Sequence, residues 1–141
     1  AAAAVMWTAS GSGPFTAVAP FYANVDDTPA YLRDTTAEVS PDNLYWTNRL
    51  IAVIADAHWY ETRNAIEYYG EQGRACGRGL VEETDAALAD AEAGDIRAAL
   101  MAANETMAGR LQDLTHKLLD NVLYTSSNLM RNSFAMSDRW V

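Results

Sequence analysis

The chain has 141 residues, enough for one domain or for part of a larger one. Its 10 Lys and Arg stand against 19 Asp and Glu, and the net charge of −9 argues against nucleic-acid or anionic-membrane partners, because both attract basic surfaces. No segment approaches the ~20 consecutive apolar residues that span a bilayer, and a single cysteine excludes an internal disulfide.

Residues 5–39 contain short β-prone runs separated by Gly and Pro, and they predict a β-hairpin followed by a loop. The strands are expected at residues 5–8 and 15–19, the second ending at Pro20 because proline has no N–H for the ladder. Since two strands alone are only marginally stable in water, this hairpin is expected to join a larger sheet. The alanines at 1–4 do not resemble a signal peptide and are interpreted as a cloning scar or unassigned residues.

Residues 40–93 predict helices. Ser40-Pro41-Asp42 combines an N-cap residue, a proline and an acid, which is typical of a helix start. A break is expected near His58, and the glycines between residues 70 and 79 predict a second break or kink, since each costs roughly 1 kcal/mol in a helix interior. Helix is then expected again over 80–93. The apolar face of the first helix is predicted to comprise Trp46, Leu50, Val53, Ile54 and Ala57.

Residues 94–130 predict one long helix packed antiparallel on another, followed by an uninterpreted tail at 131–141. The apolar stripe consists of Leu100, Met107, Leu111, Leu114, Leu118 and Val122. Asn104 and Asn121 fall on the same stripe. They either pair with polar groups across the interface and set its register, or lie at its wet edge.

Candidate catalytic chemistry centres on Cys76, which lies between Arg74 and Arg78. Flanking cations favour the thiolate, but a thiol hydrolase also needs a histidine base. His58 and His116 are the two histidines, and neither lies in a recognisable motif. We therefore interpret Cys76 as structural or incidental, and an independent Cys76 hydrolase as a weaker alternative.

No spacing in the sequence predicts a metal or cofactor site. Asp56 and His58 point about 200° apart on a helix, so they cannot coordinate one ion together with Glu61. The glycines of 11–13 and 77–79 lack the residues that complete a phosphate cradle. Four aromatic pairs either line a small-molecule pocket or belong to the core: Phe21-Tyr22, Tyr45-Trp46, Trp59-Tyr60 and Tyr68-Tyr69.

A series of landmarks over residues 5–55 nevertheless has a familiar order. The landmarks are Val5-Met6-Trp7, Pro20-Phe21-Tyr22-Ala23-Asn24-Val25, Thr28-Pro29, Val39-Ser40-Pro41-Asp42-Asn43-Leu44-Tyr45-Trp46 and Arg49-Leu50. In this order they resemble the C-terminal part of the cysteine dipeptidases of the dipeptidase A type, which are similar to the N-terminal-nucleophile hydrolases. Over 80–141 the likeness is one of helical character alone.

The resemblance implies an enzyme that hydrolyses dipeptides without a metal or organic cofactor. In such hydrolases the first residue of the mature chain is a cysteine, and its own α-amine, with a pKa near ~8, accepts the proton. Residue 1 here is Ala and Cys76 is internal, so the catalytic cysteine is expected upstream and no catalytic residue is expected in this chain.

Six residues coincide with the family-like landmarks and are candidates for a substrate pocket: Tyr22, Asn24, Asn43, Tyr45, Trp46 and Arg49. Arg49 either pairs with a peptide carboxylate or forms a salt bridge to Asp42 or Asp56.

We therefore predict an α+β, mostly helical chain, with a short hairpin followed by long antiparallel helices. The resemblance implies that residues 5–141 form the C-terminal, non-catalytic fragment of an αββα sandwich hydrolase that acts on dipeptides. No nucleic-acid or membrane partner is expected, and a homo-oligomer is one way to cover the hairpin edge. A cytoplasmic location is favoured, with secretion left open. The alternative is a small helical module whose stripe at 100–122 binds a partner protein.

Overall fold

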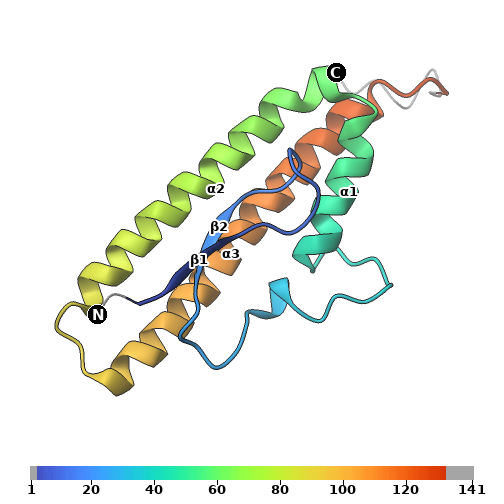
Figure 1. Ribbon diagram of the computed structural model, residues 1–141. Helices are drawn as coiled ribbons and strands as arrows, with labels where there is room; N and C mark the ends of the chain where they lie inside the picture. The colour runs from blue at the N-terminus through green and yellow to red at the C-terminus, as the bar shows by residue number, and fades with distance from the viewer. Residues whose placement is uncertain (1–2, 133–141) are drawn as a thin grey trace.

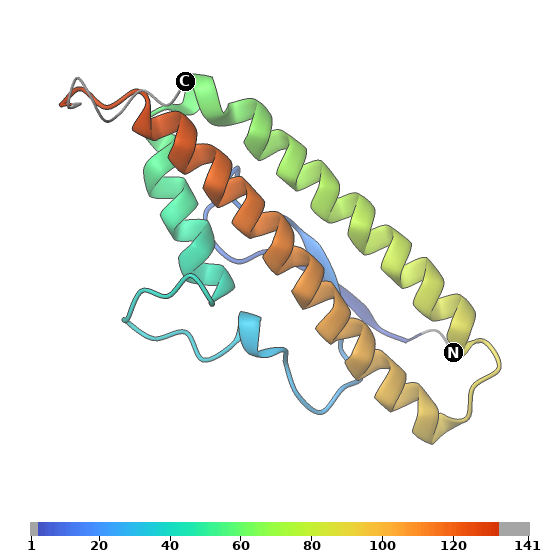
Figure 2. The same ribbon diagram turned by 180° about the vertical axis from the view of Figure 1, so that it is seen from behind.

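The structure, a computed structural model, describes residues 3–132. Its elements in chain order are β1 (Val5–Thr8), β2 (Ala19–Tyr22), the 3-10 helix η1 (Ala30–Leu32), α1 (Leu44–Asp56), α2 (Trp59–Leu88) and α3 (Ala93–Ser127). Helices α2 and α3 form a long antiparallel pair, the hairpin lies along that pair, and α1 packs near the C-terminal end of α3 (Figures 1 and 2). The predicted α+β fold, mostly helical with an N-terminal hairpin, is confirmed. Most of the tail predicted at 131–141 lies outside the described residues.

The second strand differs from its predicted position. It begins at Ala19 rather than at residue 15, and Pro20 lies within it. The Ala23 N–H donates to the Ala4 carbonyl at 2.9 Å, which fixes the alternation of hydrogen-bonded pairs along the antiparallel ladder. By that alternation Pro20 occupies a position that is not hydrogen-bonded to β1, so its missing N–H removes nothing from the ladder.

Helix α1 begins later than predicted, because its N-cap is Asn43 and not Ser40. The Asn43 Oδ1 atom accepts a hydrogen bond from the Trp46 N–H at 3.3 Å, and Asn43 Nδ2 donates to the Arg33 carbonyl at 3.1 Å. Ser40 and Asp42 instead belong to a turn, in which the Ser40 hydroxyl accepts from the Asp42 N–H at 3.2 Å. Ser40-Pro41-Asp42 therefore marks the turn that precedes the helix and not the first residues of the helix.

The buried face of α1 is also rotated from the predicted one. The buried residues are Leu44, Thr47, Asn48, Ile51 and Ala55, whereas Val53 is 69% exposed. The predicted face was centred on Trp46 because it was chosen by hydrophobicity alone. That criterion leaves out Thr47 and Asn48, which are buried because their polar atoms form hydrogen bonds within the chain. The predicted break near His58 is confirmed, since α1 ends at Asp56 and α2 begins at Trp59.

The predicted break in the glycine-rich stretch is wrong, because α2 runs without interruption from Trp59 to Leu88. Two of its glycines face the hairpin segment at very short range. A Cβ at Gly73 would lie 2.9 Å from the Ala17 Cβ, and a Cβ at Gly77 would clash with the Pro20 ring. The helix therefore tolerates these glycines because they let the hairpin segment approach its backbone.

Helix α3 carries the largest part of the core. The predicted stripe is buried at Leu100, Met107, Leu111, Leu118 and Val122, while Leu114 is half-buried. The two asparagines of the stripe differ. Asn104 is buried and pairs with the backbone of Tyr22, whereas Asn121 is exposed. Among residues 3–132 no helix has both the length and the apolar character that crossing a membrane requires.

Candidate functional site

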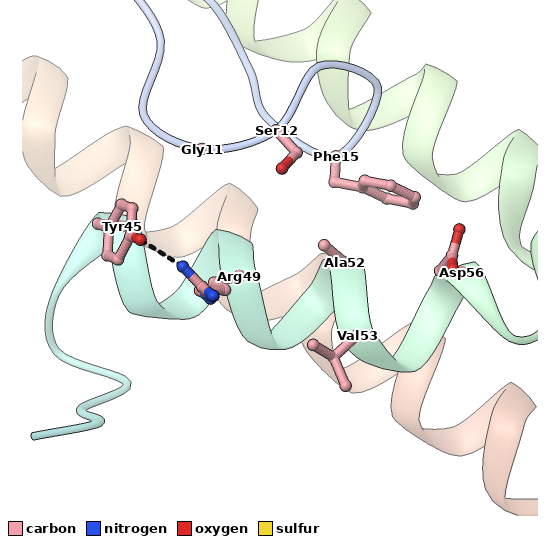
Figure 3. Close-up of a pocket in the computed structure, with 8 residues that line it drawn as sticks. All are labelled: Gly11, Ser12, Phe15, Tyr45, Arg49, Ala52, Val53 and Asp56. Carbon is pink, nitrogen blue, oxygen red and sulfur yellow. Dashed lines mark hydrogen bonds between the residues drawn. The ribbon is translucent and has the colours of Figure 1, made fainter. Parts of the chain in front are cut away.

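A groove lies between the loop of residues 11–15 and the outer face of α1 (Figure 3). Its cavity volume is about 570 Å³. The groove is lined by Gly11, Ser12, Phe15, Tyr45, Arg49, Ala52, Val53 and Asp56. The loop forms one wall and one face of a single helix forms the other, so the site depends on how the loop is attached to α1.

The loop is anchored to α1 by Asn48. Asn48 Nδ2 donates to the Ser10 carbonyl at 2.7 Å and to the Thr16 hydroxyl at 2.9 Å, so it clamps both ends of the loop. The Thr16 hydroxyl in turn donates to the Ser10 carbonyl at 2.9 Å. Gly11 has a φ of +118°, and a Cβ there would lie 3.3 Å from the Asn48 Cβ, so the loop can approach the helix only with glycine at this position.

Asn48 also connects the groove to the core. Its Oδ1 atom accepts a hydrogen bond from the Tyr69 hydroxyl of α2 at 3.2 Å, and that hydroxyl lies 2.9 Å from the Thr115 hydroxyl of α3. Burial raises the pKa of Tyr69 to about 12, which keeps its hydroxyl neutral and able to donate. One buried polar network therefore joins the loop to all three long helices.

Arg49 lies in the wall that α1 provides. Its Nη1 atom donates to the Tyr45 hydroxyl at 2.6 Å, and its guanidinium carbon lies 5.8 Å from the Tyr45 ring centre and 5.6 Å from that of Trp46. A salt bridge to Asp42 or Asp56 is not present, because no carboxylate of the described residues lies within 4.0 Å of Arg49. The aromatic rings hold the guanidinium in place and leave its charge open to a ligand.

The groove has opposite charges at its two ends. Arg49 and Asp56 are seven residues apart on one helix, which places them on the same face about 10 Å apart along its axis. Apolar groups lie between them, among them Phe15 and Ala52 (Figure 3). The ring of Phe15 is held edge-on to Trp59 at a centroid distance of 5.7 Å. The groove can therefore accept a short ligand with an anionic end, an apolar middle and a cationic end.

The structure brings together three of the six predicted pocket residues. Tyr45, Trp46 and Arg49 form one cluster, although Trp46 does not line the groove and its Nε1 atom donates to the Thr36 carbonyl at 2.8 Å. Asn43 serves as the N-cap of the same helix.

Tyr22 and Asn24 lie elsewhere, at the end of β2. The Tyr22 hydroxyl donates to Asp85 Oδ1 at 2.9 Å, and burial together with Asp85 raises the pKa of Tyr22 to about 12. Asn24 Oδ1 accepts from the Ala4 N–H at 2.9 Å. Both side chains make contacts that hold the hairpin, and neither lines the groove.

Several groove residues were not identified from the sequence, namely Gly11, Ser12, Phe15, Ala52 and Val53. The sequence suggests Asp56 as a rejected metal ligand or as a partner of Arg49, but not as the opposite end of a groove. A spacing of seven residues between opposite charges on a predicted helix was the available signal.

The remaining candidates for chemistry lie outside the groove. Cys76 is half-buried in the middle of α2, and the Arg110 Nη1 atom lies 4.0 Å from its Sγ. In the part of the chain that the structure describes, no three His, Cys, Asp or Glu side chains are close enough together to hold a metal ion.

Comparison with known proteins bears on the segment that builds the groove. The family model described as peptidase family C69 matches residues 1–72. The chain belongs to peptidase family C69. Every residue that lines the groove falls within the segment matched to C69, as do β1, β2 and α1.

The relatives that this chain matches are much longer than the chain itself. A dipeptidase of Bifidobacterium longum is 40% identical, and the alignment covers 98% of this chain and 33% of the relative. A probable dipeptidase A of Streptococcus pyogenes serotype M3 is 38% identical over 96% of this chain and 28% of the relative. Dipeptidase A of Lactobacillus helveticus is 26% identical over the same shares, 96% and 28%. The chain thus spans about a third or less of the length of the curated relatives that it matches.

Proposed function

We propose that these residues form the C-terminal, non-catalytic part of a cysteine-dependent dipeptidase, and that they bind the dipeptide. Membership of C69 and similarity to proteins named dipeptidases support this proposal. In the proposed reaction, the thiolate of an upstream cysteine attacks the peptide carbonyl and the α-amine of that cysteine holds the proton released by the thiol. The α-ammonium then gives this proton to the departing nitrogen, so the amine product leaves, and water hydrolyses the thioester to release the acyl group as a carboxylic acid.

The position of Cys76 supports a nucleophile outside this chain. Cys76 lies inside α2, so its backbone nitrogen is an amide within a helix and cannot serve as a free amine. The two histidines offer no substitute base in the groove, since neither His58 nor His116 lines it. Residues 5–141 would accordingly be one unit of a larger hydrolase.

The observation that carries the binding role is the open guanidinium of Arg49. An arginine held beside two aromatic rings, without a carboxylate of the described chain nearby, is suited to bind a carboxylate by charge-assisted hydrogen bonds. We assign the α-carboxylate of the dipeptide to Arg49 and its α-ammonium to Asp56. Two extended residues span about 7 Å, and a hydrogen bond at each end extends this reach to the scale of the ~10 Å that separates residues 49 and 56 along the helix axis.

The alternative function, a helical module that binds a partner protein, rested on the apolar stripe at 100–122. In the structure this stripe is buried inside the chain, where α3 contacts α1, α2 and β2. The stripe is therefore covered by other parts of the same chain and is not available to a partner protein. It does not support the helical-module alternative.

The binding role is tested by Arg49→Met in the full-length enzyme. Loss of a charge-assisted contact is expected to lower kcat/KM for dipeptides by about 10- to 100-fold, mainly through KM. Dipeptide amides, which lack the carboxylate, should be poor substrates of the wild type and should be little affected by the substitution.

Arg63→Met is the matched control. Arg63 is also stacked on an aromatic ring, with its guanidinium carbon 4.7 Å from the Tyr60 ring centre, but it lies on α2 outside the groove. Its kinetics should match those of the wild type. Equal effects of the two substitutions, or equal loss on dipeptides and their amides, would refute the role of Arg49.

The location of the nucleophile is tested by Cys76→Ser, also in the full-length enzyme. We expect unchanged dipeptide hydrolysis and unchanged inactivation by a thiol-alkylating reagent. Loss of activity, or activity that survives alkylation in the Ser variant, would contradict a nucleophilic cysteine elsewhere in the protein.

A further inference from the structure

The loop wall of the groove runs alongside α1 in a fixed direction. At one end Gly11 lies against Asn48, since a Cβ at Gly11 would be 3.3 Å from the Asn48 Cβ. At the other end the Phe15 ring contacts Trp59, the first residue of α2, at a centroid distance of 5.7 Å. Asn48 immediately precedes the arginine of the groove, and Trp59 closely follows its aspartate. The loop therefore passes from the arginine end at Gly11 to the aspartate end at Phe15 (Figure 3).

The two halves of the groove offer a ligand different surfaces. At the aspartate end the loop presents the Phe15 ring, which is 9% exposed and held edge-on to Trp59, so it forms a rigid apolar wall. At the arginine end the loop presents Gly11, which has no side chain, and Ser12, whose side chain is small and polar. Tyr45 bonds to the guanidinium one turn before it on α1, so it borders the anionic end of a ligand and not its middle. Burial of apolar surface therefore favours a large apolar group at the aspartate end.

We infer that Phe15 forms the subsite for the side chain of the amino-terminal residue of the dipeptide, and that the enzyme selects dipeptides by the order of their two residues. A dipeptide with its α-carboxylate at Arg49 and its α-ammonium at Asp56 has its amino-terminal residue beside Phe15. Its carboxy-terminal residue lies beside Gly11 and Ser12. Dipeptides with a large apolar residue first and a small or polar residue second are therefore preferred. The inference rests on the proposed function, because the two charges set the direction of the bound dipeptide.

A pair of dipeptides of identical composition tests the inference in the full-length enzyme. Leucyl-alanine and alanyl-leucine have the same atoms and the same terminal charges, so a difference between them reports which subsite receives the leucine. We expect kcat/KM to be higher for leucyl-alanine by about 10-fold or more, the discrimination that an apolar pocket gives between side chains of different size. Arg49→Met should lower kcat/KM of both dipeptides by the same factor, because both carry the α-carboxylate.

Phe15→Leu assigns the preference to the ring. Leucine keeps an apolar side chain at a buried position, so the loop stays packed, but it lacks the broad surface of the ring. We expect the ratio of the two kcat/KM values to fall by about threefold or more. Phe21→Leu is the matched control. Phe21 is also 9% exposed, but it lies on β2 and does not line the groove, so its substitution should leave the ratio unchanged.

Two results would overturn the inference and leave the proposed function standing. In the first, Arg49→Met weakens both dipeptides, but the wild type hydrolyses alanyl-leucine as well as leucyl-alanine or better. In the second, the wild type prefers leucyl-alanine, but Phe15→Leu leaves the ratio unchanged or Phe21→Leu changes it equally, which places the subsite elsewhere. A third result, in which Arg49→Met weakens neither dipeptide, would refute the binding role of the groove and the inference with it.

Discussion

Asn48 and Arg49 are adjacent on α1 and have opposite environments. Asn48 is 1% exposed and its amide is hydrogen-bonded to the loop on one side and to Tyr69 on the other. Arg49 is exposed, and of its described neighbours only Tyr45 shares a hydrogen bond with it. One helix therefore has a closed face, where polar atoms are satisfied internally, and an open face, where charge is available to a ligand.

The difference separates structural from binding roles. A buried polar atom without a partner costs about 1–3 kcal/mol, so substitutions on the closed side should lower the free energy of unfolding. An exposed charge contributes little to that free energy, so substitutions in the groove should change binding instead. Unfolding measurements on variants of buried and of groove residues test this difference.

The largest effect is expected for Gly77→Val, at the buried contact between α2 and the hairpin. A Cβ at this position would clash with the Pro20 ring and lie 3.2 Å from Trp7, so the hairpin has to move away from α2. We expect the free energy of unfolding, measured by urea denaturation, to fall by about 3 kcal/mol. In Gly79→Ala, by contrast, the new Cβ meets nothing within 4 Å, and helix propensity should stabilise the protein by up to about 1 kcal/mol. Equal effects of the two substitutions would refute the close packing.

A smaller loss is expected for Asn48→Ala, which removes the clamp on the loop. The Ser10 carbonyl and the Tyr69 hydroxyl each lose a partner, and we expect a loss of about 2 kcal/mol in the free energy of unfolding. Asn121→Ala is the control, because Asn121 is exposed on α3 and its substitution should change that free energy by less than about 0.5 kcal/mol. A loss in both variants alike would mean that the network does not stabilise the fold.

The free energy of unfolding depends on pH through Tyr69, which belongs to the buried network around Asn48. Its pKa is raised to about 12 in the folded protein, against 10.0 for an unperturbed tyrosine. The unfolded chain therefore loses this proton first, and stability that is fully present below pH 10 declines as the pH rises towards 12. By pH 11 the free energy of unfolding should have fallen by about 1 kcal/mol from this group. Tyr69→Phe should remove that part of the decline. If the free energy of unfolding of the variant falls with pH as in the wild type, the pKa of Tyr69 is not raised in the folded protein.

Much of this fold was predictable from the sequence, and the exceptions share a cause. The long helix at Ala93–Ser127, its apolar stripe and the break at His58 follow from periodicity and local signals. The uninterrupted α2 and the position of β2 do not, because both depend on contact between residues distant in sequence, such as Gly77 with Pro20. Propensity describes a glycine in isolation, whereas here the missing side chain is what allows two segments to meet.

The candidate site was only partly predictable for the same reason. Tyr45, Trp46 and Arg49 lie within one helical turn, so their cluster is local and the sequence indicated it. Tyr22 and Asn24 were grouped with them because of their order in the chain, but the fold directs both to the hairpin. The loop wall, with Gly11, required knowledge that Asn48 binds Ser10 across a long sequence separation.

The smallest effect on stability is expected for Arg49→Met, and that small size is informative. Arg49 is exposed, and its contacts are one hydrogen bond to Tyr45 and the proximity of two aromatic rings, against which a methionine side chain can also pack. We therefore expect the free energy of unfolding to stay within about 0.5 kcal/mol of the wild type. A loss close to that of Asn48→Ala would make Arg49 a structural residue and remove the contrast between the faces. An intact fold combined with the loss of dipeptide binding requires the opposite conclusion: the charge of residue 49 is retained for a ligand, while its neighbour at 48 holds the wall against which that ligand lies.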